Sequence, residues 1–277
     1  MLAKIREAFV TEVAKDEPQF NLARTALLMS GYLKQTSEVT SYLTLLDKMA
    51  QAAKPSVKAA NTDLEIIDAL NRYLFIDMNF SGNSTDYYHP DNSFLNKVLD
   101  SRTGIPISLS VIYLEMGWRL GLPLWGVGIP RHFIVGYGSP GNPIYIDVFN
   151  QGRILSEDDC LAISNTPSAE RFTFRKKFLK PATKKAILFR MMLNLKQIYI
   201  NREDWEAAYK VVELMLIIRP NDITGLRDRG LLAYRLDRLH DAIFDIKRYL
   251  FLESSSFDAS WLEQRLEIME EKLMRLN

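Results

Sequence analysis

A histidine and an aspartate stand on two strands that the sequence predicts to be neighbours. His132 opens the predicted strand 132–137, and Asp147 lies on the predicted strand 144–148. If these strands pair, the carboxylate can orient the imidazole as a general base. A thiol at a nearby helix N-terminus would complete an acyl-transfer site, because the helix dipole and a protonated histidine favour the thiolate. The structural alternative is a hydrogen bond that stabilises the sheet by about 1–3 kcal/mol.

A loop and a buried helix precede these strands. Residues 79–92 are rich in Gly, Asn, Ser, Asp and Pro, which predicts a loop. Pro106 suits the first turn of a helix that runs to about Leu120, and Gly121 is its expected left-handed end. The residues between are apolar almost all round, so we expect this helix to be buried on most sides. Short β-rich segments follow at 124–129, 132–137 and 144–148. The predicted fold class is therefore α+β, with a buried helix packed on an antiparallel sheet.

The first hundred residues carry helical patterns to which we assign no chemistry. Ser37 can cap a helix that Pro55 is expected to end. Thr62 and Glu65 have the spacing of a capping box, which predicts the start of another helix.

A 34-residue repeat is visible after residue 186. Ala208 and Ala242 are 34 residues apart (242 − 208), which is the length of a tetratricopeptide unit. The segments 204–208 and 238–242 are the expected turns into the second helix of each unit. A final helix at about 260–276 is expected to cap the array. Two repeats are fewer than the about three needed for independent stability, so the array is expected to lean on the preceding domain.

Three segments carry a resemblance to a known family. They are DYYHPDNSFLNKVLDSRTGIPISLSVIYLEMGWRLGLP, GVGIPRHFIVGY and IYIDVFNQG. Together they resemble the SirB-one family, transglutaminase-like proteins with a C-terminal tetratricopeptide region, over roughly residues 20–275. The resemblance implies a papain- or transglutaminase-like core in which His132 and Asp147 match the His and Asp of the superfamily's triad. Members of this family are generally bacterial.

The resemblance and the repeat together predict two domains. Residues 1–182 would form a transglutaminase-like domain with N-terminal helices, its core at about 79–165. Residues 183–277 would form a tetratricopeptide-like region of two repeats and a capping helix.

The position of the family's nucleophile is occupied by a proline. Transglutaminase-like enzymes place the cysteine in a Gly-x-Cys context at the start of a helix that ends in Leu-Gly-x-Pro. Aligning residues 120–123 with that ending puts Gly104-Ile105-Pro106 on the Gly-x-Cys. Since proline has no nucleophilic atom, the usual acyl-enzyme cannot form at Pro106.

Three other residues are weighed as substitutes for the thiol. Ser108 lies roughly 200° around the helix from Pro106 and should face away from His132. Ser110 returns to nearly the same face but about 6 Å along the axis. Cys160 follows a run of acidic residues, which would raise the pKa of its thiol. A small buried cysteine is the simpler interpretation.

The candidate binding residues surround the His–Asp pair in the chain. They are Tyr87, Tyr88, Asn92, Asn96, Arg102 and Arg131. Tyrosine and arginine are favoured at recognition surfaces, whereas asparagine bonds to turn backbones. We expect Tyr87 and Tyr88 to line a groove beside His132, with Asn92, Asn96 and Arg102 bracing the loop. Arg131 stands where family members often have a small residue, and it could compete for Asp147. His89 is expected at the surface.

A basic stretch runs from Arg171 to Lys185. It holds seven basic residues and no acidic one, interleaved with Phe172, Phe174 and Phe178. Such a strip can bind phosphates and stack bases. The alternative is an edge strand and linker whose charges are solvated and whose phenylalanines turn inward.

Composition narrows the function classes. Lys and Arg number 35 against 34 Asp and Glu, and this balance argues against a nucleic-acid or membrane-surface protein. The single Cys160 excludes an internal disulfide and a multi-thiolate zinc site. The three histidines are far apart, so we expect no metal and no cofactor. A charged N-terminus and the lack of a long apolar run predict a cytoplasmic protein.

Two functions from different classes follow. The first is a non-catalytic scaffold or regulator that binds a protein or peptide through the groove and the repeats. The alternative is a hydrolase or acyltransferase of amide or ester bonds that uses His132 and Asp147 with a non-cysteine nucleophile. The oligomeric state is left open.

Overall fold

The chain folds into two compact units. The computed structural model describes residues 1–277 except 36–37, 166, 168–170, 255 and 277, and it leaves out the side chains of Phe172, Lys176 and Leu276. The N-terminal unit spans Met1–Met191 and the C-terminal unit Met192–Asn277. The boundary falls within a helix, α9 (Lys184–Asn201).

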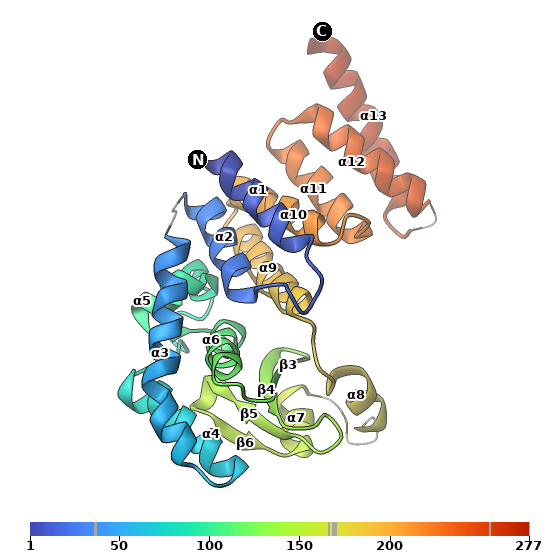
Figure 1. Ribbon diagram of the computed structural model, residues 1–277. Helices are drawn as coiled ribbons and strands as arrows, with labels where there is room; N and C mark the ends of the chain where they lie inside the picture. Colours follow the sequence, from blue (N-terminus) through green and yellow to red (C-terminus); the bar gives the residue numbers. More distant parts are fainter. Residues whose placement is uncertain (36–37, 166, 168–170, 255, 277) are drawn as a thin grey trace. The chain divides into compact units, whose positions relative to one another are not determined.

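Helices form the first part of the N-terminal unit (Figure 1). They are α1 (Leu2–Val13), α2 (Leu22–Lys34), α3 (Val39–Ala59), α4 (Asp63–Asn71) and the π-helix η1 (Arg72–Asp77). The capping box of Thr62 and Glu65 is present at the start of α4. Pro55, however, lies inside α3 and does not end it, because the buried face of the helix continues from Ala53 to Val57. The expected cap at Ser37 lies outside the described residues.

Helix α6 (Pro106–Arg119) is the buried helix that the sequence predicts. Twelve of its fourteen residues are buried, Pro106 is its first residue, and Gly121 follows it with a φ of +75°. The preceding loop contains the 3-10 helix η2 (Pro90–Ser93), and α5 (Leu95–Ser101) follows it. Two-residue strands β1 (Ser81–Gly82) and β2 (Thr103–Gly104) pair in parallel, which brings the loop alongside the start of α6.

A four-stranded antiparallel sheet packs on α6, which is seen nearly end-on in Figure 1. Its order is β3 (Leu124–Ile129), β4 (His132–Tyr137), β5 (Ile144–Asp147) and β6 (Arg153–Leu155), with the 3-10 helix η3 (Val148–Asn150) between the last two. Leu124 faces α6, since a Cβ added to Gly117 would lie 2.0 Å from its side chain. The α+β class is therefore confirmed, and β6 is a strand that sequence patterning missed.

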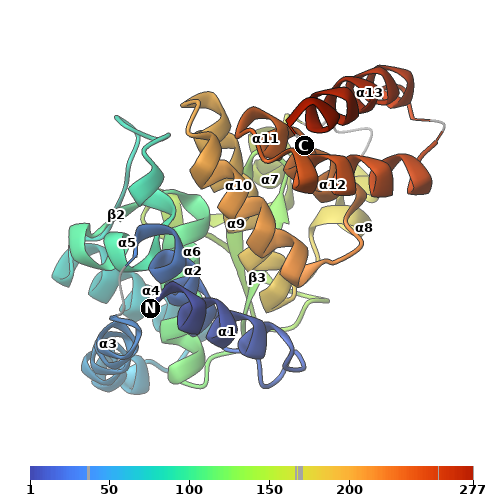
Figure 2. The same ribbon diagram turned by 90° about the horizontal axis from the view of Figure 1, so that it is seen from above.

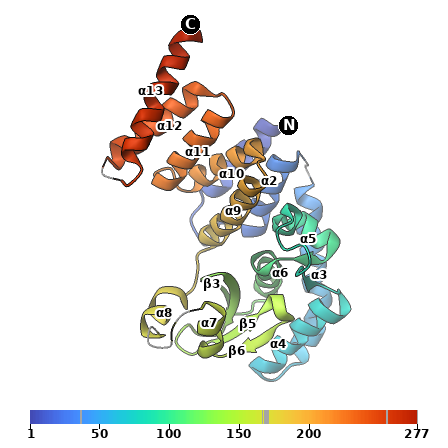
Figure 3. The ribbon, with the colours of Figure 1, turned by 180° about the vertical axis from the view of Figure 1, so that it is seen from behind.

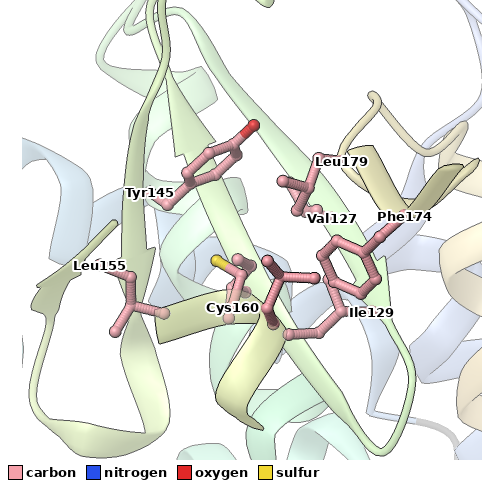
Figure 4. Close-up of a cluster of buried hydrophobic side chains, with 9 residues drawn as sticks. Val127, Ile129, Tyr145, Leu155, Cys160, Phe174 and Leu179 are labelled. Atoms are coloured by element: carbon pink, nitrogen blue, oxygen red, sulfur yellow. The ribbon is translucent and has the colours of Figure 1, made fainter. Parts of the chain in front are cut away.

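The other face of the sheet is covered by α7 (Glu157–Ile163) and α8 (Arg171–Phe178) (Figure 3). Figure 4 shows Cys160 of α7 and Phe174 of α8 packed with strand residues such as Val127. The edge strand expected in the basic stretch is thus wrong for 171–178. Phe174 and Phe178 are four residues apart, so a helix turns both toward this cluster. The side chain of Phe172 lies outside the description.

Five of the basic side chains in the stretch from Arg171 to Lys185 contact acidic residues of α7 or aromatic rings. Arg171 pairs with Asp158, and Arg175 pairs with Glu157 at 3.2 Å. Lys177, Lys184 and Lys185 lie over aromatic rings at 5.1–5.9 Å from their centroids. These contacts match the solvated, structural interpretation of the stretch more closely than a phosphate-binding strip.

The C-terminal unit is a stack of helices (Figure 2). It contains the end of α9, then α10 (Trp205–Ile218), α11 (Ile223–Arg235), α12 (Leu239–Leu252) and α13 (Ala259–Leu276). The expected turns at 204–208 and 238–242 are instead the starts of α10 and α12, with only Asp204 and Arg238 before the helices, and the buried Ala208 and Ala242 occupy equivalent places on them. The 34-residue repeat is therefore two helix pairs followed by α13. Within the described part of the chain, no helix is both long and apolar enough to span a membrane.

Candidate functional site

His132 and Asp147 meet at the end of the sheet. The two strands are antiparallel, with Val135 opposite Ile146, so His132 at the start of β4 lies near the end of β5. His132 Nε2 is 2.9 Å from Asp147 Oδ1, and the Asp147 side chain is 2% exposed. Asn150 donates to the same carboxylate from its side chain, at 2.7 Å to Oδ2, and from its backbone, at 3.3 Å to Oδ1. The carboxylate is therefore fixed from two sides, and it holds the imidazole in turn.

Hydrogen bonding decides the charge state of Asp147. Burial would raise the pKa of this carboxyl, but the hydrogen bond and charge of His132 and the two bonds from Asn150 together lower it. Asp147 is thus a carboxylate at neutral pH, and it accepts a hydrogen bond from the Nε2–H group of His132.

This lowered pKa makes an acid-stability prediction. A group whose folded pKa is depressed stabilises the native state above its unfolded pKa, about 3.9 for Asp, and loses that contribution as pH falls through the folded value. We expect the free energy of unfolding of Asp147→Asn to be lower than that of the wild type at pH 6. Between pH 5 and pH 3 it should fall less steeply than that of the wild type. Urea unfolding at several pH values measures this. Parallel curves for the two proteins would show that Asp147 gains nothing from ionising.

Two residues that sequence reasoning missed belong to this site. The rings of Phe149 and His132 are nearly perpendicular, at a centroid distance of 6.2 Å. Asn150 follows Asp147 by three residues, the spacing at which an aspartate side chain accepts from a backbone amide. Both lie in the segment IYIDVFNQG, so an Asp-x-x-Asn turn after a strand was the available signal.

Aromatic rings connect the loop to the imidazole. The ring of Tyr87 lies 5.2 Å from that of Tyr88 and 6.1 Å from that of Phe149, in edge-to-face geometry. The backbone of Gly82 in β1 lies against the ring of Phe149, since a Cβ added to Gly82 would lie 2.6 Å from that ring. Tyr88 is 68% exposed. The structure thus brings Tyr87 and Tyr88 toward His132 through Phe149.

The polar loop residues mostly hold backbone. Asn92 donates to the carbonyls of Asp86 and Tyr87 at 2.7 and 3.2 Å, and it accepts from Asn83 at 3.1 Å. The buried Asn96 has an Oδ1 atom without a hydrogen bond among the described residues.

Two further loop residues make local contacts. Arg102 ends α5 with a φ of +58°, and its carbonyl accepts from Ser81. His89 differs from the surface residue expected, because it is half-buried and its Nδ1 accepts from the Asp91 amide at 3.2 Å.

Among the described contacts, no side chain at the start of α6 bonds to the histidine. Pro106 is buried there as the first helical residue. Ser108 donates to the carbonyl of Asn92 at 2.6 Å and accepts from the amide of Ile105 at 3.1 Å, so its hydroxyl braces the loop against the helix. Ser110 is fully buried, with no hydrogen bond to its hydroxyl among the described residues.

Cys160 is inert as well as distant in sequence from the predicted thiol position. It is fully buried in the apolar cluster of Figure 4. Burial and the charges of Asp159, Glu157 and Asp147 raise the pKa of its thiol to about 12. The expected effect of the acidic residues is confirmed, and the thiolate does not form at neutral pH.

Arg131 lies in the turn that presents His132. Its φ is +65° and its side chain is exposed, while Asp147 is bonded to His132 and Asn150. Among the described contacts Arg131 does not compete for Asp147.

This turn favours glycine over arginine. Left-handed backbone strains a residue that has a Cβ. We expect Arg131→Gly to stabilise the protein by up to about 1 kcal/mol, because the relief of strain exceeds the added unfolded-state entropy. Chemical unfolding measures the change. A loss of stability would instead reveal a contact of the arginine side chain worth more than the strain.

Polar residues of the loop and of α5 line a cavity of about 500 Å³. Its lining includes Asn83, His89, Asn92, Lys97 and Asp100. Of the candidate binding residues only Asn92 is among the residues lining it. No group of three or more His, Cys, Asp or Glu side chains suited to a metal occurs in the described part of the chain.

Comparison with known families agrees with this architecture. Residues 40–193 match the family model described as transglutaminase-like superfamily, and residues 195–267 match a tetratricopeptide repeat model. The fold and the His–Asp site therefore define a transglutaminase-like domain followed by tetratricopeptide repeats.

Relatives of similar length refine this class. The chain is 34% identical over 254 residues to a UPF0162 protein of Xylella fastidiosa strain Temecula1, covering 91% of this chain and 90% of that one. A UPF0162 protein of Vibrio cholerae is 29% identical over 184 residues, 66% of this chain and 68% of its own. The chain belongs to the transglutaminase-like superfamily and, within it, to the UPF0162 proteins. F-box only protein 21 of Homo sapiens is 39% identical over 104 residues, 35% of this chain and 17% of that protein.

Proposed function

We propose that this chain is a non-catalytic transglutaminase-like protein that binds a protein or peptide as a regulator or scaffold. The observation that carries the proposal is Pro106 at the first residue of α6, where the superfamily's thiol would stand. Ser108 is engaged with backbone groups, and Cys160 is buried with a raised pKa. The His132–Asp147 pair then remains without a nucleophile to activate.

Two surfaces suit the proposed partner. The exposed Tyr88 and the half-buried Tyr87 are linked to His132 through the ring of Phe149, and tyrosine supplies large contact area at low entropic cost. The tetratricopeptide region supplies a second surface, since stacked helical repeats commonly bind peptides along one side. Nucleic acids, membranes and cofactors are not part of the proposal.

Capture of partners by matched variants tests this function. Tyr88→Ser should lose a specific partner from native lysate while unfolding at the wild-type temperature, because the side chain is 68% exposed. Leu64→Ser, on α4 and 58% exposed, is the control and should retain the partner. If the wild-type chain captures no protein above background, the proposal fails.

The alternative function is hydrolysis or acyl transfer at amide or ester bonds. It is favoured by the geometry of the dyad. Nε2 of His132 is hydrogen-bonded to the ionised carboxylate of Asp147, which Asn150 also holds, while Nδ1 of His132 makes none of the described hydrogen bonds. Water or a substrate hydroxyl would then be the nucleophile, and His132 the base that takes its proton.

His132→Ala separates the two functions. Loss of a turnover activity with unchanged stability would support the enzyme. Wild-type protein without turnover on ester and amide substrates, together with a destabilised variant, would support the non-catalytic role.

We also propose the SirB-one assignment and a bacterial cytoplasmic location, supported by the motifs, the bacterial relatives and a free buried cysteine.

A further inference from the structure

The last helices of the C-terminal unit leave apolar side chains uncovered. Phe251, Leu252, Phe257, Trp261 and Ile268 are exposed, with Phe251 at 87% and Phe257 at 96%. We call these five residues the terminal face. They lie at the end of α12, in the connection that follows and on α13. Such exposure of three aromatic rings is unusual for a surface that stays in water.

The repeat explains why four of these five positions are apolar. One unit of 34 residues earlier, Phe251, Leu252, Phe257 and Ile268 correspond to Ile217, Ile218, Ile223 and Tyr234. All four of those are half-buried. Ile223 packs against the cluster of Ile246, Tyr249 and Leu262, and Tyr234 packs against the cluster that contains Met269. In the first repeat, residues of α12 and α13 thus pack against Ile223 and Tyr234, whereas no described helix covers the corresponding positions of the terminal face.

The charges around the face favour an identical surface as the cover. From Lys247 to Arg275 there are five basic and six acidic side chains, so the charge of this stretch is nearly balanced. They are Lys247, Arg248, Arg265, Lys272 and Arg275, with Glu253, Asp258, Glu263, Glu267, Glu270 and Glu271. Two copies of a strongly charged surface would repel each other, whereas a balanced one can face itself.

The exposed area is also sufficient. At about 150–250 Å² for a fully exposed aromatic side chain, the terminal face offers roughly 600 Å² of apolar surface. Two such faces would bury about 1,200 Å², within the range of specific interfaces. We infer that two copies of this chain associate through their terminal faces in a symmetric dimer, with Phe251 and Phe257 at its centre. Because each face covers the other, the dimer closes and does not extend into a filament.

Sedimentation velocity of the full chain tests the inference. We expect the wild type to sediment as a concentration-dependent dimer from about 1 µM upward, the weak end for an interface of this size. Phe251→Ser combined with Phe257→Ser should weaken dimerisation at least about 30-fold, as loss of buried aromatic anchors does. Phe244→Ser is the matched control, because Phe244 is 63% exposed on the same helix but corresponds to the polar Lys210 one repeat earlier.

Each outcome decides the inference. Dimer lost in the double variant and kept in Phe244→Ser, with unchanged circular dichroism in both, supports it. A monomeric wild type overturns it and leaves the terminal face to a helix of another protein. Growth into higher oligomers overturns the closed, symmetric pairing. An unchanged dimer in the double variant overturns the assignment of the face.

Discussion

Gly152→Ala is expected to destabilise the N-terminal unit by about 3 kcal/mol, from backbone strain and a steric clash together. Gly152 has a φ of +77°, and a Cβ there would lie 2.2–2.3 Å from the side-chain amide of Asn71. That amide donates to the Gly152 carbonyl and accepts from the hydroxyl of the buried Tyr113. Displacing Asn71 therefore breaks both bonds and leaves the tyrosine hydroxyl unpaired.

Gly138→Ala is the matched control for this prediction. Gly138 has a similar φ of +84°, but an added Cβ would meet nothing within 4 Å. Gly138→Ala should therefore lose only the stability that corresponds to backbone strain, about 1 kcal/mol. Urea unfolding of both variants gives the difference. Equal losses would mean that Asn71 moves aside freely and does not anchor this turn.

The variant also probes the candidate site. The amide of Gly152 donates to the carbonyl of Asp147 at 2.9 Å, so a shift of Gly152 moves the residue that holds His132. We expect the ring resonances of His132 to shift in Gly152→Ala and not in Gly138→Ala.

Glu115→Ala is expected to cost about 2–3 kcal/mol, because it leaves the buried Ala23 amide without an acceptor and removes the buried partner of Arg119. Glu115 of α6 is 5% exposed and accepts from the Ala23 amide at the start of α2, at 2.9 Å. It also pairs with Arg119, which is half-buried on the same helix. Without the carboxylate, the amide at the first turn of α2 has no acceptor and the guanidinium loses its buried partner.

Asp47→Ala is the control for the buried pair. Asp47 binds the same Arg119 at 2.7 Å, but its side chain is 66% exposed, so the loss should stay below about 1 kcal/mol. Unfolding free energies of the two single variants distinguish a buried anchor from a surface ion pair. Similar losses would show that the amide of Ala23 finds another acceptor.

Local sequence signals predicted much of the fold and part of the site. Pro106 at the first turn of α6, Gly121 beyond its end and the Thr62–Glu65 box each act through geometry within a few residues. The strands that carry His132 and Asp147 were visible from residue types, and the 34-residue repeat from equivalent alanines. Each of these features depends on residue types within a short stretch of the chain or on their spacing in the sequence.

Packing between distant segments decided the rest. Pro55 stays within α3 because its neighbours bury a continuous face, and the basic segment 171–178 is a helix because Phe174 and Phe178 reach the cluster around Cys160. Likewise, Ser108 became a brace only when folding brought the carbonyl of Asn92 within 2.6 Å. Burial depends on which surfaces meet, and no short stretch of chain carries that information, so these outcomes required the folded molecule.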